Sequence, residues 1–253
     1  TIEKVEEFLK YTDRSPDEAI GTFEPTKREG TVWKIAVNGV MAGCRPEYMP
    51  VLIAVAEAII DPLYPLIELG TTHGSTPWLV INGPIIQQLS FNSSTSTLGP
   101  GCQANATVGR FTRLILINIS RFLPGLNDLS AFGWPGKFGM CMAESDDQSP
   151  WESLGVERGY KQGVSVVTAF TTPGLTGAFT TAGDTAEEHL KGLAGHVPRN
   201  ITYSSLTKPT NYAVVVLSPL IAGIIAKGGY SKQDVKEYLF KNARLSAAEF
   251  SSM

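Results

Sequence analysis

This sequence contains too few residues of several kinds to fit some common functional classes. Its 253 residues include only three cysteines, which excludes a disulfide framework and indicates a reducing compartment, the cytoplasm. Lys and Arg total 21 against 24 Asp and Glu, so no basic surface for nucleic acid is expected. The longest apolar run, 212–226, is interrupted by Ser218 and Pro219 and is too short to span a membrane. The polar residues 1–10 predict a surface helix rather than a secretory signal.

The chain does contain a regular alternation of apolar strands and helices. This order predicts an α/β fold, a mostly parallel sheet with helices on both faces. With 253 residues the chain can bury a full core, and we expect a single domain over 1–253; a boundary between two lobes would fall near 125–135. We predict strands at 32–37, 138–144, 163–170, 212–217 and in the apolar run from Trp78, and helices at 47–60, 108–119, 184–193, 219–226 and 231–242.

The stretch 32–60 organises the functional prediction. A β-rich segment, Val32–Val37, is followed by the small or polar residues 38–45, which let a backbone approach a ligand closely, and then by the apolar helix predicted at 47–60. Cys44 would lie at the N-terminus of this helix beside Arg45, where the helix dipole and the guanidinium favour a thiolate. The alternative is that Cys44 is a small buried residue filling a tight turn.

A second loop enters a helix at 99–107. It is rich in glycine, hydroxyl and amide groups, and its backbone N–H groups would bind a carboxylate or phosphate. It matches no Walker or dinucleotide glycine pattern, and a flexible surface linker is the alternative. The candidate substrate-binding residues of the two loops are Asn38, Arg45, Glu47, Gly101, Cys102, Asn105, Thr107 and Arg110.

Two residues are candidates for moving a proton. Glu144 ends the strand predicted at 138–144, and His73 lies in a hydroxyl-rich turn that leads into another strand. An ordinary loop histidine is the alternative for His73. Asp146 and Asp147 are interpreted as a solvated turn. No metal ligands are assigned beside these candidates, and the sequence identifies no cofactor.

Seven stretches of the chain carry a family resemblance: 38–48 (Asn-Gly-Val-Met-Ala-Gly-Cys-Arg-Pro-Glu-Tyr), 99–101, 104–110, 141–144, 149–152, 157–159 and 228–239. Together they resemble UGSC-like proteins, a bacterial family known more by sequence than by reaction. The family is associated with a module that carries a selenocysteine- or cysteine-Gly-Ser-Cys motif, so the resemblance implies thiol or redox chemistry. No Gly-Ser-Cys occurs here, and a second polypeptide would have to supply it. The family pattern also has a Glu-His pair where this chain has Leu220-Ile221, and often an aromatic residue at Cys102.

Three functions remain open from the sequence. The first is a small-molecule enzyme, an oxidoreductase or carbon–heteroatom lyase, in which Cys44 acts as a thiolate on an anionic substrate and Glu144 or His73 moves a proton. The second is a metal or iron–sulfur dehydratase that uses Cys44, Cys102 and Cys141 as ligands. The third is a non-catalytic subunit. We expect a homo-oligomer, or a hetero-oligomer with a subunit that carries the redox motif.

Overall fold

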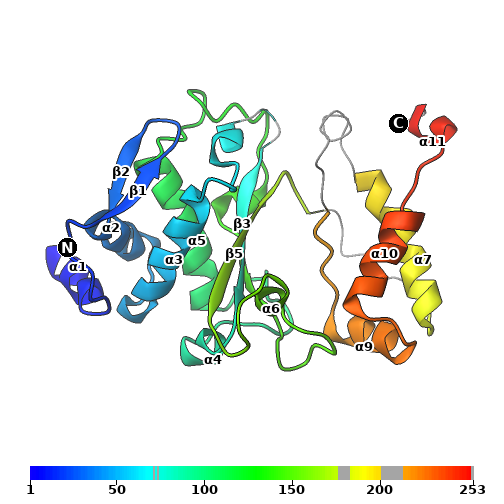
Figure 1. The fold of residues 1–253 in the computed structure, drawn as a ribbon. Coiled ribbons are helices and arrows are strands. Elements are labelled where there is room, and N and C mark those ends of the chain that lie inside the picture. The colour runs from blue at the N-terminus through cyan, green and yellow to red at the C-terminus, as the bar shows by residue number, and fades with distance from the viewer. Residues whose placement is uncertain (71, 73, 176–182, 201–212, 252–253) are drawn as a thin grey trace. The chain divides into compact units, whose positions relative to one another are not determined.

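The structure is a computed structural model in which the chain divides into two compact units (Figure 1). The first unit comprises Thr1–Asp146 and Ser153–Leu175, and the second Asp147–Glu152 and Thr176–Met253. The segment 125–135, where a lobe boundary was predicted, therefore lies inside the first unit. The structure describes residues 1–70, 72, 74–175, 183–200 and 213–251.

The prediction of a strand at 32–37 is wrong, because this segment forms the helix α2 (Val32–Ala42). Thr31 caps the helix by accepting a hydrogen bond from the backbone N–H of Lys34. The buried residues recur at helical spacing, which favours a helix once a packing surface is present, despite the β-branched residues. Gly43 ends α2 in the left-handed conformation, with φ of 83°.

A three-stranded sheet forms the centre of the first unit. Its middle strand is β3 (Thr76–Asn82), which pairs in parallel with β4 (Cys141–Ala143) and antiparallel with β5 (Val166–Thr172). A separate antiparallel pair joins β1 (Ala19–Phe23) and β2 (Arg28–Thr31). The α/β character is thus present, but both sheets are small and the larger one is mixed, whereas a mostly parallel sheet was predicted.

The two faces of the three-stranded sheet contribute to different clusters. Residues Leu79, Ile81, Cys141 and Ala143 belong to the main core, to which the helices α3 (Met49–Ile60) and α5 (Gln103–Asn118) contribute (Figure 1). Alternate residues of the same strands face the other way, as the period of two requires. These form a second cluster of Trp78, Val80, Met140, Met142 and Phe170.

A close backbone contact holds α5 against the chain that enters β4. A Cβ atom on Gly109 would lie 3.0 Å from the carbonyl carbon of Gly139 and 3.4 Å from the backbone nitrogen of Cys141. A side chain at Gly109 would require the backbone around Gly139 to shift, and Gly139 itself has φ of 146°, which favours glycine. The other short elements of this unit are α1 (Ile2–Leu9), η1 (Pro46–Tyr48), η2 (Leu66–Gly70), α4 (Ile85–Gln88), η3 (Pro135–Phe138) and α6 (Leu154–Glu157).

The second unit is helical in its described part. Leu190, Ile225 and Val235 form its core, and Ser231 and Asp234 form the predicted capping box. Residues 213–217, predicted as part of a strand, form none, and Tyr212 lies outside the described residues. Its helices are α7 (Ala186–His196), η4 (Val197–Asn200), α9 (Pro219–Lys227), α10 (Lys232–Asn242) and α11 (Ala247–Ser251). In the described part of the chain, no helix combines the length and apolar character needed to cross a membrane.

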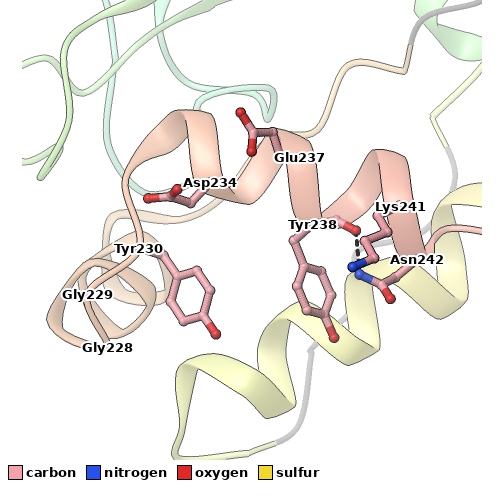
Figure 2. A pocket seen from close by; sticks show the side chains of 8 residues that line it. All are labelled: Gly228, Gly229, Tyr230, Asp234, Glu237, Tyr238, Lys241 and Asn242. Atoms are coloured by element: carbon pink, nitrogen blue, oxygen red, sulfur yellow. Dashed lines mark hydrogen bonds between the residues drawn. The ribbon is translucent and has the colours of Figure 1, made fainter.

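A shallow hollow of about 630 Å³ lies on the second unit beside α10 (Figure 2). Its polar side chains make local hydrogen bonds: Asp234 accepts from Ser231, Glu237 from Gln233, and Asn242 donates to the carbonyl of Tyr238. These contacts stabilise α10, and we assign the hollow no ligand. It is lined by Gly228, Gly229, Tyr230, Asp234, Glu237, Tyr238, Lys241 and Asn242.

Candidate thiol site

Cys44 lies between two helices, after the end of α2 and before η1 and α3. Its backbone N–H donates to the carbonyl of Gly39, and its side chain is buried. Burial raises the pKa of the Cys44 thiol to about 11, although a hydrogen bond with Thr107 acts in the opposite direction. The expected thiolate is therefore not favoured, because the dipole of the following helix does not compensate for burial and the negative end of α2 is also close.

Cys102 has the position that was predicted for Cys44. It is the N-cap residue of α5, a helix of 16 residues, and it is half-buried rather than buried. Its Sγ lies 3.3 Å from the carbonyl oxygen of Ser90, to which the thiol donates. The next residue, Gln103, donates from Nε2 to the carbonyl of Gly43 at 3.1 Å, so the first turn of α5 is joined to the residue before Cys44.

Cys141 completes a group of sulfurs from three distant parts of the chain. Burial raises the pKa of its thiol, and negative charge at Cys102 and Cys44 would raise it further, so both sulfurs lie within electrostatic range of Cys141. In the described part of the chain, however, no three His, Cys, Asp or Glu side chains are close enough together to hold a metal ion. The iron–sulfur alternative, with these three cysteines as ligands, is therefore not proposed.

The loop that precedes α5 is ordered by a buried amide. Asn105 accepts from the backbone N–H of Asn92 at 2.8 Å and donates to the carbonyls of Asn92 and Thr97 at 2.9 and 3.1 Å. Asn105 therefore shapes the loop, which argues against a flexible linker. Gly101 has φ of 115° and is exposed, and a Cβ there would meet no atom within 4 Å, so the chain is not crowded at the residue before Cys102.

Most of the other candidate residues of the two loops contact neighbouring protein groups, which was not expected. Arg45 lies 3.0 Å from Glu47 through Nε, with its guanidinium carbon 5.0 Å from the centre of the Tyr48 ring. Asn38 is buried, where it donates to the carbonyl of Lys34 and accepts from Asn118 at 2.7 Å. Asn38 thus joins α2 to α5 and does not face a ligand. Arg110 is exposed on α5, and Thr107 donates to the carbonyl of Gln103.

Glu144 lies away from the sulfurs, on the face of the sheet that carries Trp78 and Val80. Its Oε2 accepts from Nδ2 of Asn82 at 2.6 Å and from the backbone N–H of Leu154 at 2.8 Å. Asp146 and Asp147 lie in a turn, as predicted, and Asp147 is exposed. Asp146 is only half-exposed, because it accepts from the same Asn82 amide and from the N–H of Gly83. His73 lies outside the described residues.

Ser145 is the strand-end side chain that faces the loop before α5. Its hydroxyl donates to the carbonyl of Ser93 at 2.7 Å. The period of two along a strand could have indicated this. Ser145 is an even number of residues from Cys141 and so shares its face, whereas Glu144 is an odd number away. Tyr48 was also not predicted as a site residue; it lies within electrostatic range of Cys44 and Cys102, and no local sequence signal indicated this.

The chain matches no protein-family model, no curated protein and no solved structure. The resemblance to UGSC-like proteins therefore stays a prediction.

Proposed function

We propose that this chain is a thiol-dependent enzyme that acts on a small anionic molecule, with Cys102 as the attacking sulfur. The observation that carries the proposal is the position of Cys102, half-exposed at the N-cap of α5. Of the three sulfurs, that of Cys102 is the one in a residue that is not buried, so a small molecule can reach it more readily than Cys44 or Cys141.

The same helix end supports an anionic substrate. Among the described side chains, none caps the first turn of α5, so its N–H groups are available to a carboxylate or phosphate. The open space beside Gly101 leaves room for a small molecule next to the sulfur. Cys44 and Cys141 are buried, and their raised pKa values keep them as thiols at neutral pH.

Alkylation of the native protein with iodoacetamide, followed by mass spectrometry of each cysteine, tests this assignment. We expect Cys102 to react first between pH 7 and 9, and Cys44 to react slowly until the pH approaches about 11. All three cysteines should react in denaturant, which controls for detection. Preferential labelling of Cys44, or three inert cysteines in the native protein, would remove Cys102 as the nucleophile.

A panel of small carboxylates and phosphates then tests the substrate class. A molecule bound at the N-terminus of α5 should protect Cys102 from iodoacetamide and raise the melting temperature of the wild type. The variant Cys102→Ser should keep the thermal shift but show no turnover of a substrate found in this way. Full turnover by Cys102→Ser would contradict the proposed chemistry.

A further inference from the structure

The segment between α5 and β4 exposes several large apolar side chains to solvent. Phe132 is fully exposed, Phe138 is 82% exposed, and Leu126 and Leu129 are both more than half exposed. A single exposed apolar residue is common on a protein surface and needs no explanation. A concentration of them in one short segment is typical of a surface that contacts another molecule.

Buried contacts hold this segment in a defined conformation. The carboxylate of Asp128 accepts hydrogen bonds from Arg113 and from Lys137, each at 2.7 Å. Further along the segment, the indole of Trp134 donates to the carbonyl of Gly74 at 3.0 Å. A surface that is already ordered loses less conformational entropy on binding than a mobile loop does. The exposed side chains are therefore presented on a preorganised support.

A further exposed residue adjoins the segment from η2. A Cβ atom on Gly70 would lie 2.5 Å from the carbonyl oxygen of Asn127, so the two stretches of backbone are in contact. Ile67 lies one 3₁₀ turn before Gly70, which places it on the same side of η2, and it is 64% exposed. We refer to these exposed residues together as the apolar surface, which comprises Ile67, Leu126, Leu129, Phe132 and Phe138.

We infer that the apolar surface binds a second copy of this chain. Its five side chains expose roughly 600 Å², so two copies would bury about 1,200 Å², which is enough for a specific interface. The stretch 122–139 has two charged residues, Asp128 and Lys137, and they pair with each other below the surface. Two copies can therefore meet without opposing like charges, and an apolar patch is complementary to itself across a two-fold axis.

Light scattering during size-exclusion chromatography tests this with the full chain. At about 100 μM the mass should be twice 27.2 kDa, and it should fall towards that of one copy on dilution to about 0.1 μM. A wild type that stays monomeric at the higher concentration overturns the proposal and leaves the surface to a different protein. A mass that keeps increasing beyond two copies also overturns it, because a two-fold contact is closed.

Substitution of the two aromatic residues tests where the copies meet. Phe132→Ser and Phe138→Ser should each raise the Kd of the dimer by about thirtyfold or more, the effect of truncating an aromatic residue at the centre of an interface. Phe240→Ser is the matched control, since Phe240 is also 82% exposed but lies on α10 of the second unit. It should change the Kd by less than about twofold. Sedimentation velocity measures the Kd, and urea unfolding checks that each variant folds.

Hydrogen exchange of the wild type gives a readout that needs no variant. Backbone amides of 124–139 should exchange more slowly at about 100 μM than at about 0.1 μM, while peptides from α10 exchange equally at both. Protection that increases only in other peptides would show that the dimer forms elsewhere and would refute the apolar surface. An unchanged Kd in both folded variants, Phe132→Ser and Phe138→Ser, would refute it as well.

Discussion

Cys141 and Glu144 lie three residues apart in sequence but belong to opposite faces of the three-stranded sheet. Cys141 packs in the main core, to which α5 contributes, whereas Glu144 accepts a hydrogen bond from Asn82 on the face that carries Trp78 and Val80. The alternation of side chains along β4 therefore separates the sulfurs from the carboxylates. A mechanism at Cys102 must draw on the α5 face of the sheet.

This separation predicts that Glu144 has no part in the reactivity of Cys102. Glu144→Gln should change the rate of Cys102 alkylation by iodoacetamide by less than about twofold, since no charge beside the sulfur is altered. A change of less than about 1 kcal/mol in stability is expected, because the amide oxygen can still accept the Leu154 N–H. Mass spectrometry and urea unfolding measure the two quantities. A tenfold slower alkylation would place Glu144 at the thiol site after all.

Asn82 should be important for stability, because its Nδ2 donates to both Glu144 and Asp146. Asn82→Asp would replace this shared donor by a third carboxylate in a site that is 1% exposed. We expect a loss of about 2–3 kcal/mol in the free energy of unfolding at pH 7, measured with urea. Gln148→Glu, which adds the same charge at an exposed position, should change stability by less than about 0.5 kcal/mol. If the two variants lost equal free energy of unfolding, the loss would come from the added charge and not from the hydrogen bonds of Asn82.

Asp128 is a buried carboxylate between two cations, Arg113 and Lys137, each at 2.7 Å. Burial would raise the pKa of Asp128, but hydrogen bonds from Lys137, Ser130 and Arg113 outweigh it and hold this pKa well below its ordinary range. Asp128→Asn should cost about 3 kcal/mol at pH 7, because it leaves two cations without their counter-charge. Asp17→Asn, at an exposed carboxylate, is the control and should have little effect.

The pH dependence of this variant follows from the sign of the shift. A carboxyl pKa that is lower in the folded than in the unfolded chain stabilises the fold above the unfolded value of about 3.9. The contribution of Asp128 is then lost as the pH falls through its folded-state pKa. Urea unfolding should show a constant difference between wild type and Asp128→Asn above about pH 5 and a narrowing difference below about pH 4. A difference that grows on acidification would contradict the ion-pair network.

Two glycines inside helices should respond in opposite ways to alanine. At Gly109 in α5 the new Cβ would press on the backbone of Gly139, so Gly109→Ala should destabilise the first unit by about 1–3 kcal/mol. At Gly223 in α9 a Cβ meets no atom within 4 Å, so Gly223→Ala should stabilise the helix by about 0.5–1 kcal/mol. Hydrogen exchange of peptides from α5 and α9 separates the effects. Faster exchange in α9 of Gly223→Ala would refute the second expectation.

Much of the chain could be assigned from local sequence. The apolar segment after Pro46 forms α3, the apolar run from Trp78 forms most of β3, and the Ser231 capping box begins α10. In each case the apolar pattern and the residues that begin the element indicate the same structure. Contacts with distant segments are therefore not needed to choose between helix and strand. The entry of a Gly-rich loop into a helix was also predicted correctly, but its boundary was not. The loop was predicted over 99–107 and the helix from 108, whereas α5 begins at Gln103 and therefore includes Asn105 and Thr107.

The site depended on contacts that a single segment does not determine. Val32–Ala42 contains β-branched residues, but it packs as a helix against α1 and α5, and this packing outweighs propensity. Whether Cys44 ionises depends on burial by distant segments, which reverses the effect expected from Arg45 beside it. By itself the sequence determined most elements and which loops carry polar groups. The tertiary structure decided which sulfur is accessible and which face Glu144 occupies, because burial and proximity arise only from long-range packing.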